Sequence, residues 1–139
     1  MKQKSFRWCM LVGAIALGAV AIFYFATYVE LTIALGNNGL KPDLMQSIQA
    51  LWLAFACHVA LIALLYLLVA YKPHAVSREV IVILGMLQLV EAGLLFAFSG
   101  SLVAAVLLAL AAVFVLVGAL IWPKKLLPQA PATGSIAPV

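Results

Sequence analysis

Four long stretches of almost uninterrupted apolar sequence cover most of this chain, at residues 8–35, 44–71, 80–98 and 102–122. A transmembrane helix needs about 20 consecutive apolar residues, so each stretch is long enough to cross a bilayer. Residues that end or interrupt helices lie between them, since glycine and asparagine favour helix C-terminal caps and proline cannot continue a helix. The pattern predicts an all-α fold, a bundle of four transmembrane helices.

Polar residues at two of the boundaries favour helix starts. Asp43 is followed three residues later by Gln46, a spacing typical of a capping box in which each side chain bonds a free backbone amide. Ser77 is suited to cap the third span, and Glu79 places a negative charge beside the positive end of that helix.

Composition excludes an ordinary soluble domain. Hydrophobic residues make up 68% of the 139 residues, charged residues only 9%, and the mean hydropathy is +1.24. A soluble domain of this length has too much surface for its volume to hide so many apolar side chains. We therefore expect one membrane domain over residues 1–126. The proline-rich segment 127–139 lacks periodicity and is expected to form a disordered cytoplasmic tail.

The basic residues indicate how the spans are oriented. Seven of the eight lie before the first span, between the second and third, or after the fourth, and only Lys41 lies on the other side. By the positive-inside rule, both termini are cytoplasmic in a multi-pass protein of the bacterial inner (plasma) membrane. An alternative is cleavage of a signal peptide after Ala19-Val20-Ala21, but the apolar run continues beyond it. No basic stripe indicates nucleic-acid binding.

Small residues at helical spacing predict close packing between helices, because in lipid they let backbones approach one another. We expect the packing faces to include Ala105, Ala109 and Ala112 of the fourth span, Gly85 of the third, and Ala54 of the second. The same faces would allow packing against a second copy or another membrane protein.

Four polar side chains interrupt the apolar spans: Glu30, His58, Gln88 and Glu91. Such groups usually face the bundle interior and indicate a functional site. We expect an inward-facing cluster, shallow at Glu30 and deeper at the other three. In the alternative, the spans are rotated so that these side chains do not meet. Gln88 and His58 would then only join helices, and Glu30 would extend to the interface.

No motif for a cofactor or a catalytic triad is found, and no metal site is predicted. Cys9 and Cys57 lack CxxC spacing, and His58 with Glu91 and Glu30 has no diagnostic metal-ligand spacing. In size and topology the layout resembles DoxX-like bacterial proteins. In carrying acidic and histidine residues within the bundle it is similar to the sterol-isomerase and sigma-2-receptor superfamily. Both resemblances concern architecture only.

Three functions fit this sequence. The first is an accessory or assembly protein that packs against other membrane proteins, favoured by the small extramembrane mass. The second is a binder or transporter of a small or lipid-like molecule, with Glu91, His58 and Gln88 as polar anchors in an apolar cavity. The third is a membrane enzyme that uses His58 and Glu91 as an acid–base pair, which requires the two side chains to lie within hydrogen-bond reach.

Overall fold

The computed structural model describes residues 2–99 and 102–122, and in this part of the chain all regular secondary structure is helical. The α helices are α1 (Lys2–Ala26), α2 (Tyr28–Asn37), α3 (Pro42–Tyr71), α4 (Arg78–Leu94) and α5 (Leu102–Leu120). A short 3-10 helix, η1 (Pro73–Ala75), joins α3 to α4, and a π-helical segment, η2 (Leu95–Ser99), extends α4. The predicted tail at 127–139 lies outside the described residues.

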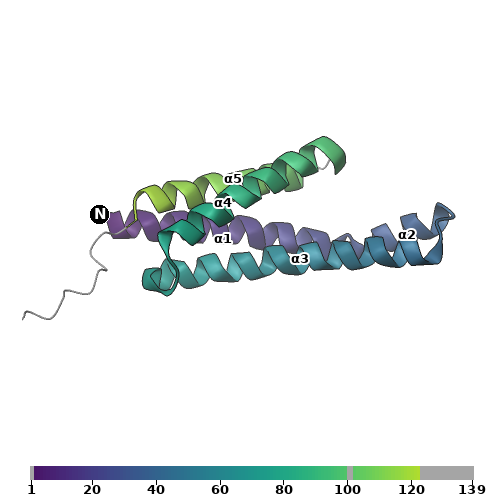
Figure 1. Cartoon of the computed structure of the whole chain (residues 1–139), viewed down its shortest axis with the longest axis horizontal. Coiled ribbons are helices and arrows are strands. Elements are labelled where there is room, and N and C mark those ends of the chain that lie inside the picture. The colour runs from purple at the N-terminus through teal and green to yellow at the C-terminus, as the bar shows by residue number, and fades with distance from the viewer. Residues whose placement is uncertain (1, 100–101, 123–139) are drawn as a thin grey trace, which may run out of the picture.

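Four helical stretches are long and apolar enough to cross a membrane, which agrees with the four predicted spans. They cover Gln3–Asn37, Pro42–Tyr71, Arg78–Phe98 and Leu102–Leu120. At about 1.5 Å per residue, the fourth is about 28 Å long and the second about 45 Å. The hairpin made by α2 and the start of α3 therefore extends well past the end of α4 and the start of α5 (Figure 1).

The helices follow one another around the bundle in the order α3, α1, α5, α4. Helix α1 packs against both α3 and α5, and α5 also packs against α4. By contrast, the backbones of α3 and α4 do not pack closely along their length, and side chains bridge the space between them. We call this α3–α4 boundary the seam.

Close approach of α1 and α5 depends on glycine. A Cβ atom added at Gly13 would lie 2.6 Å from Cγ2 of Val115, and one at Gly118 would meet Met10. On the other side of α5, a Cβ at Gly85 of α4 would lie 2.9 Å from Leu116. The small residues of α5 complete these contacts: Ala105 and Ala112 are buried, and Ala109 is half-buried against the core.

The packing face predicted for the second span needs correction. Ala54 is exposed on the outside of the bundle, as are Ser47, Ala50 and Cys57. Helix α3 instead turns the face containing Ala56, Ala63 and Ala70 toward the core. Both faces carry small residues at helical spacing, so the sequence pattern alone does not decide between them.

The first predicted span is not one continuous helix. It is interrupted at Thr27, between α1 and α2. The Thr27 hydroxyl donates to the Phe23 carbonyl at 2.9 Å, and the indole N–H of Trp52 on α3 donates to the Tyr24 carbonyl at 2.8 Å. Side-chain bonds of this kind at helix carbonyls are a recognised cause of helix bends.

One end of the bundle gathers the start of α1, the α3–α4 connection and the end of α5 (Figure 1). There the Arg7 guanidinium lies 4.2 Å from the centre of the Tyr71 ring. Arg78 donates from Nε to the Ala119 carbonyl at 2.8 Å, which satisfies a free carbonyl at the end of α5. Lys41 lies at the opposite end, before α3.

Candidate functional site

The seam contains a direct contact between two ionisable side chains. His58 projects from the middle of α3 and Glu91 from the last turn of α4, and His58 Nε2 lies 3.1 Å from Glu91 Oε1. The His58 side chain is 41% exposed and that of Glu91 is 15% exposed, so the pair sits at the edge of the bundle with the carboxylate turned inward. This distance meets the hydrogen-bond requirement stated above for an acid–base pair.

A second bridge crosses the seam one helical turn along α4. The Tyr66 hydroxyl donates to Gln88 Oε1 at 3.2 Å, and both side chains are fully buried. Because Gln88 and Glu91 both bond to α3, both lie on the face of α4 that is turned toward the seam. The structure thus brings three of the four predicted polar residues to one boundary, as two separate pairs.

Each bridge leaves one buried polar atom without a partner. Among the described residues these atoms are Gln88 Nε2, a donor, and Glu91 Oε2, an acceptor when the carboxylate is ionised. A buried polar atom without a hydrogen bond costs about 1–3 kcal/mol, which makes each such atom a feature that needs an explanation. Two complementary atoms one turn apart on one helix face suggest a common partner.

Glu91 also forms part of the wall of a pocket at the seam. This pocket has a volume of about 380 Å³ and is lined by Phe55, Glu91, Leu94, Leu95 and Phe98. The π-helical segment begins at Leu95, directly after the helix that carries Glu91. Such π-helical turns often occur at functional sites. Here the segment supplies Leu95 and Phe98 to the pocket wall.

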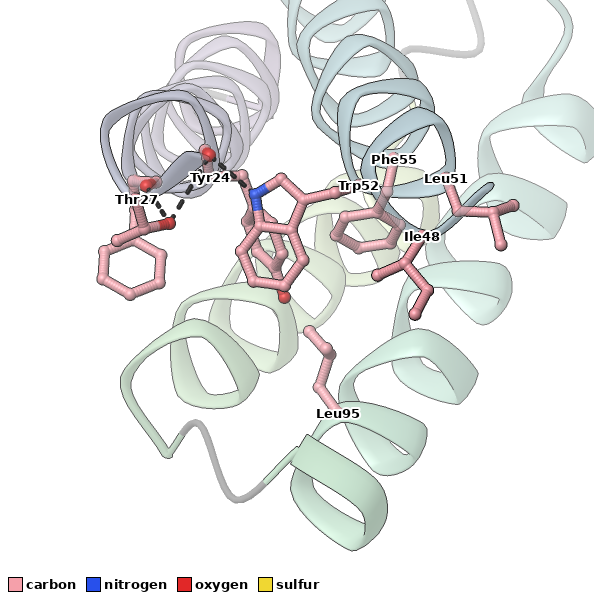
Figure 2. A pocket seen from close by; sticks show the side chains of 8 residues that line it. Tyr24, Thr27, Ile48, Leu51, Trp52, Phe55 and Leu95 are labelled. Atoms are coloured by element: carbon pink, nitrogen blue, oxygen red, sulfur yellow. Dashed lines mark hydrogen bonds between the residues drawn. The ribbon is translucent and has the colours of Figure 1, made fainter. Parts of the chain in front are cut away.

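A larger, apolar groove, open along one side and called the chamber below, adjoins this pocket and shares Phe55 and Leu95 with it. Its volume is about 560 Å³, and its walls are Phe23, Tyr24, Thr27, Ile48, Leu51, Trp52, Phe55 and Leu95. Figure 2 shows Trp52 and Phe55 of α3 beside Tyr24 of α1, with Leu95 facing them from the opposite side. The Tyr24 ring centre lies 4.7 Å from that of Trp52 and 4.9 Å from that of Phe55.

Glu30 does not belong to this site. It lies on α2, beyond the interruption at Thr27, and its side chain is exposed. The described residues contain no group of three or more His, Cys, Asp or Glu side chains able to hold a metal ion. The predicted inward-facing cluster therefore needs correction at its shallow end, because α2 continues past the helices that enclose the other three residues.

Sequence reasoning did not identify Tyr66, Trp52, Phe55 or Leu95 as site residues. Tyr66 had a usable signal, since a tyrosine within an apolar span needs a hydrogen-bond partner when it is buried. Leu95 had no signal, because nothing in its sequence context differs from that of the other leucines.

Comparisons with protein-family models, with curated proteins and with solved structures found no match. The architectural resemblances noted from the sequence are therefore not accompanied by a matching family, and the interpretation of the site rests on its geometry.

Proposed function

We propose that this protein is a multi-pass protein of the bacterial inner membrane that binds a small, lipid-like molecule at the seam between α3 and α4. The observation that carries this proposal is the position of Glu91. Its carboxylate contacts His58 and lines an apolar pocket, which shares residues with a chamber walled by aromatic side chains. An apolar cavity with a few convergent polar groups is the usual form of a small-molecule site.

Helix lengths support a position for the site within the bilayer. Helix α5 is about 28 Å long, close to the roughly 30 Å of a bilayer's hydrocarbon core. Glu91 lies thirteen residues after Arg78, about 20 Å along α4. If the end of the bundle that carries Arg7 and Arg78 faces the cytoplasm, Glu91 lies in the outer half of the membrane, and the chamber lies between it and the outer surface.

The same placement explains Glu30. The interruption at Thr27 is about as far from the basic end as the start of α5, so α2 and the start of α3 would project beyond the hydrocarbon (Figure 1). Glu30 and Asp43 are then charged residues in or beyond the lipid headgroups, where a carboxylate keeps contact with water. Only Glu91 among the acidic residues would be held deep in the membrane.

An accessory role is a second candidate, and one observation favours it. The small-residue face of α3 that contains Ala50, Ala54 and Cys57 is exposed along the helix. Small residues on an outer helix face allow the backbone of another membrane helix to approach closely. Binding a lipid-like molecule and packing against a partner are compatible, because this face and the chamber involve different residues of α3.

Blocking the chamber tests the proposed function. Leu95 lines both cavities, so Leu95→Trp should fill the space that the ligand occupies. Val90 lies on the adjoining helix α4, is 58% exposed and lines neither cavity, so Val90→Trp is the matched control. Each protein is purified in detergent, and the small molecules that it retains are extracted and measured by mass spectrometry.

The expected result is a discrete molecule, close to one per protein chain, that is retained by the wild type and by Val90→Trp and lost from Leu95→Trp. The same mixture of bulk lipids from all three proteins would contradict the proposal.

A further inference from the structure

We propose that the ligand is an alcohol, a molecule with one hydroxyl group on an apolar body, and that its hydroxyl binds between Gln88 Nε2 and Glu91 Oε2. This inference rests on the proposed function and adds the chemical class of the ligand. It starts from the two buried polar atoms that have no partner among the described residues.

The two atoms have complementary hydrogen-bonding character. An amide nitrogen donates, and an ionised carboxylate oxygen accepts. A hydroxyl group both accepts and donates through one oxygen atom, so a single hydroxyl satisfies both. An ether lacks the donor, and an ammonium group lacks the acceptor, so neither satisfies the pair.

The burial of the site limits the size of the polar group. Gln88 is completely buried, and the Glu91 side chain is only 15% exposed. Gln88 Nε2 and Glu91 Oε2 are both covered, so the side chains over them must move to admit a ligand, and a single oxygen atom requires less movement than a phosphate or a sugar headgroup. Glu91 forms part of the pocket wall, so the hydroxyl approaches from this pocket.

The residues that line the pocket and the chamber determine the chemical nature of the rest of the ligand. Phe55 and Leu95 line both the Glu91 pocket and the neighbouring chamber, whose walls also include Trp52 and Tyr24. These walls are aliphatic and aromatic, and they favour hydrocarbon over polar groups because burial of apolar surface is the main source of binding energy there. The alcohol therefore places its hydroxyl at Glu91 and its hydrocarbon in the aromatic chamber.

Fluorescence quenching of Trp52 provides the test. The chain contains three tryptophans, so Trp8→Phe with Trp122→Phe leaves Trp52, in the chamber wall, as the only reporter. The probes are an ω-bromoundecanol, its methyl ether and the corresponding ω-bromoundecylamine, added to the protein in lipid nanodiscs. A matched protein that retains only Trp8, which is 67% exposed near the opposite end of the bundle, reports the amount of each probe in the bilayer.

The bromoalcohol should quench Trp52 in a saturable manner, at about one tenth of the concentration that the ether requires, because each hydrogen bond contributes roughly a threefold to tenfold change in affinity. This preference should disappear in Glu91→Leu, which removes the oxygen to which only the alcohol donates. In Gln88→Met, alcohol and ether should both bind more weakly and the preference should remain, because both accept from the Gln88 amide. Since Gln88→Met leaves the Tyr66 hydroxyl without its acceptor, Tyr66→Phe combined with Gln88→Met is a further variant, and it should behave like Gln88→Met.

The remaining outcomes distinguish the two proposals. Equal, saturable quenching by alcohol and ether would overturn the hydroxyl assignment and leave the proposed function standing. Stronger quenching by the amine would overturn it in favour of a cationic ligand. If every probe quenches Trp52 only in proportion to its quenching of Trp8, the chamber binds none of the probes. That result would contradict both proposals.

Discussion

Removing the contact between His58 and Glu91 should destabilise the bundle by different amounts, depending on which of the two residues is replaced. His58→Leu leaves the Glu91 carboxylate, whose side chain is only 15% exposed, without its partner. Glu91→Leu removes both carboxylate oxygens, including the buried one that has no hydrogen bond, and leaves only the more exposed His58 without a partner. His58→Leu is therefore the more damaging substitution, although both remove the same contact.

The size of the coupling between the two side chains follows from their separation and from the couplings measured in other membrane proteins. Two full charges 3.1 Å apart would attract each other by about 5 kcal/mol at an effective dielectric constant near 20. Measured couplings between polar side chains in membrane proteins are much smaller, about 0.6 kcal/mol on average and at most about 1.7. Because the two groups are ionisable and lie only 3.1 Å apart, we expect a coupling of about 1–1.5 kcal/mol, in the upper part of the measured range.

In free energies of unfolding, we expect losses of about 2 kcal/mol for His58→Leu, about 1 for Glu91→Leu and about 1.5–2 for the double variant, which together give the expected coupling. Reversible unfolding in bicelles, followed by helix content and tryptophan fluorescence, measures all three. Glu30→Gln combined with His58→Leu is the control pair, because Glu30 is exposed on α2 and the two effects should add. Additivity within about 0.5 kcal/mol for the His58 and Glu91 pair would refute the reasoning.

Two further predictions concern helix packing. Gly13→Ala should lower the free energy of unfolding by about 1–3 kcal/mol, because the added Cβ would lie 2.6 Å from Cγ2 of Val115, whose branched side chain has little freedom to move. Gly18→Ala, on the same helix with no atom within 4 Å of the added Cβ, should be neutral or slightly stabilising, and equal losses in the two variants would count against the α1–α5 contact. Trp52→Phe should cost about 1 kcal/mol, because it removes the indole N–H that donates to the Tyr24 carbonyl. Amide hydrogen exchange should rise locally at the α1–α2 junction, and an unchanged exchange rate there would show that the bend does not depend on this bond.

Residues at the helix ends were predictable to different degrees. Ser77 was expected to cap the third span, and its hydroxyl oxygen accepts the Val80 amide at 3.5 Å. The capping box expected from Asp43 and Gln46 is wrong, because the helix begins at Pro42 and Lys41 is its N-cap residue. Proline is favoured in the first turn of a helix, and here it moves the start two residues ahead of the expected one.

The rotation of each helix was not predictable from the sequence. Soluble helices show which face is buried by alternating apolar and polar residues, but a span that is apolar all around gives no such signal. This is why Ala54 was placed in a packing face although it is exposed, while Ala56 two residues later is buried. The interruption at Thr27 was also missed, and the Trp52 indole that bonds the Tyr24 carbonyl beside it comes from a distant part of the sequence.

The polar residues of the seam could be named from the sequence, but their pairing could not. A glutamate, a histidine and a glutamine within apolar spans are conspicuous whatever the helix rotation. Which of them meet depends on the space between α3 and α4, where long side chains rather than backbones make the contacts. The sequence predicts a shallower position for Glu30 than for Glu91, but the separation of Glu30 from the other three residues depends on the length of α2 beyond Thr27.

The separation between the His58 imidazole and the Glu91 carboxylate in a lipid bilayer tests the account most directly. Solid-state NMR on protein labelled with ¹⁵N at histidine and ¹³C at glutamate measures this separation through the dipolar coupling between the two side chains. His74 is removed by His74→Gln, so that His58 is the only labelled histidine. We predict strong dephasing of the carboxylate signal, as expected for an Nε2 to Oε1 distance of 3.1 Å, and its loss in Glu91→Gln. Absence of dephasing in the bilayer-embedded protein would contradict the α3–α4 seam and the binding site built on it.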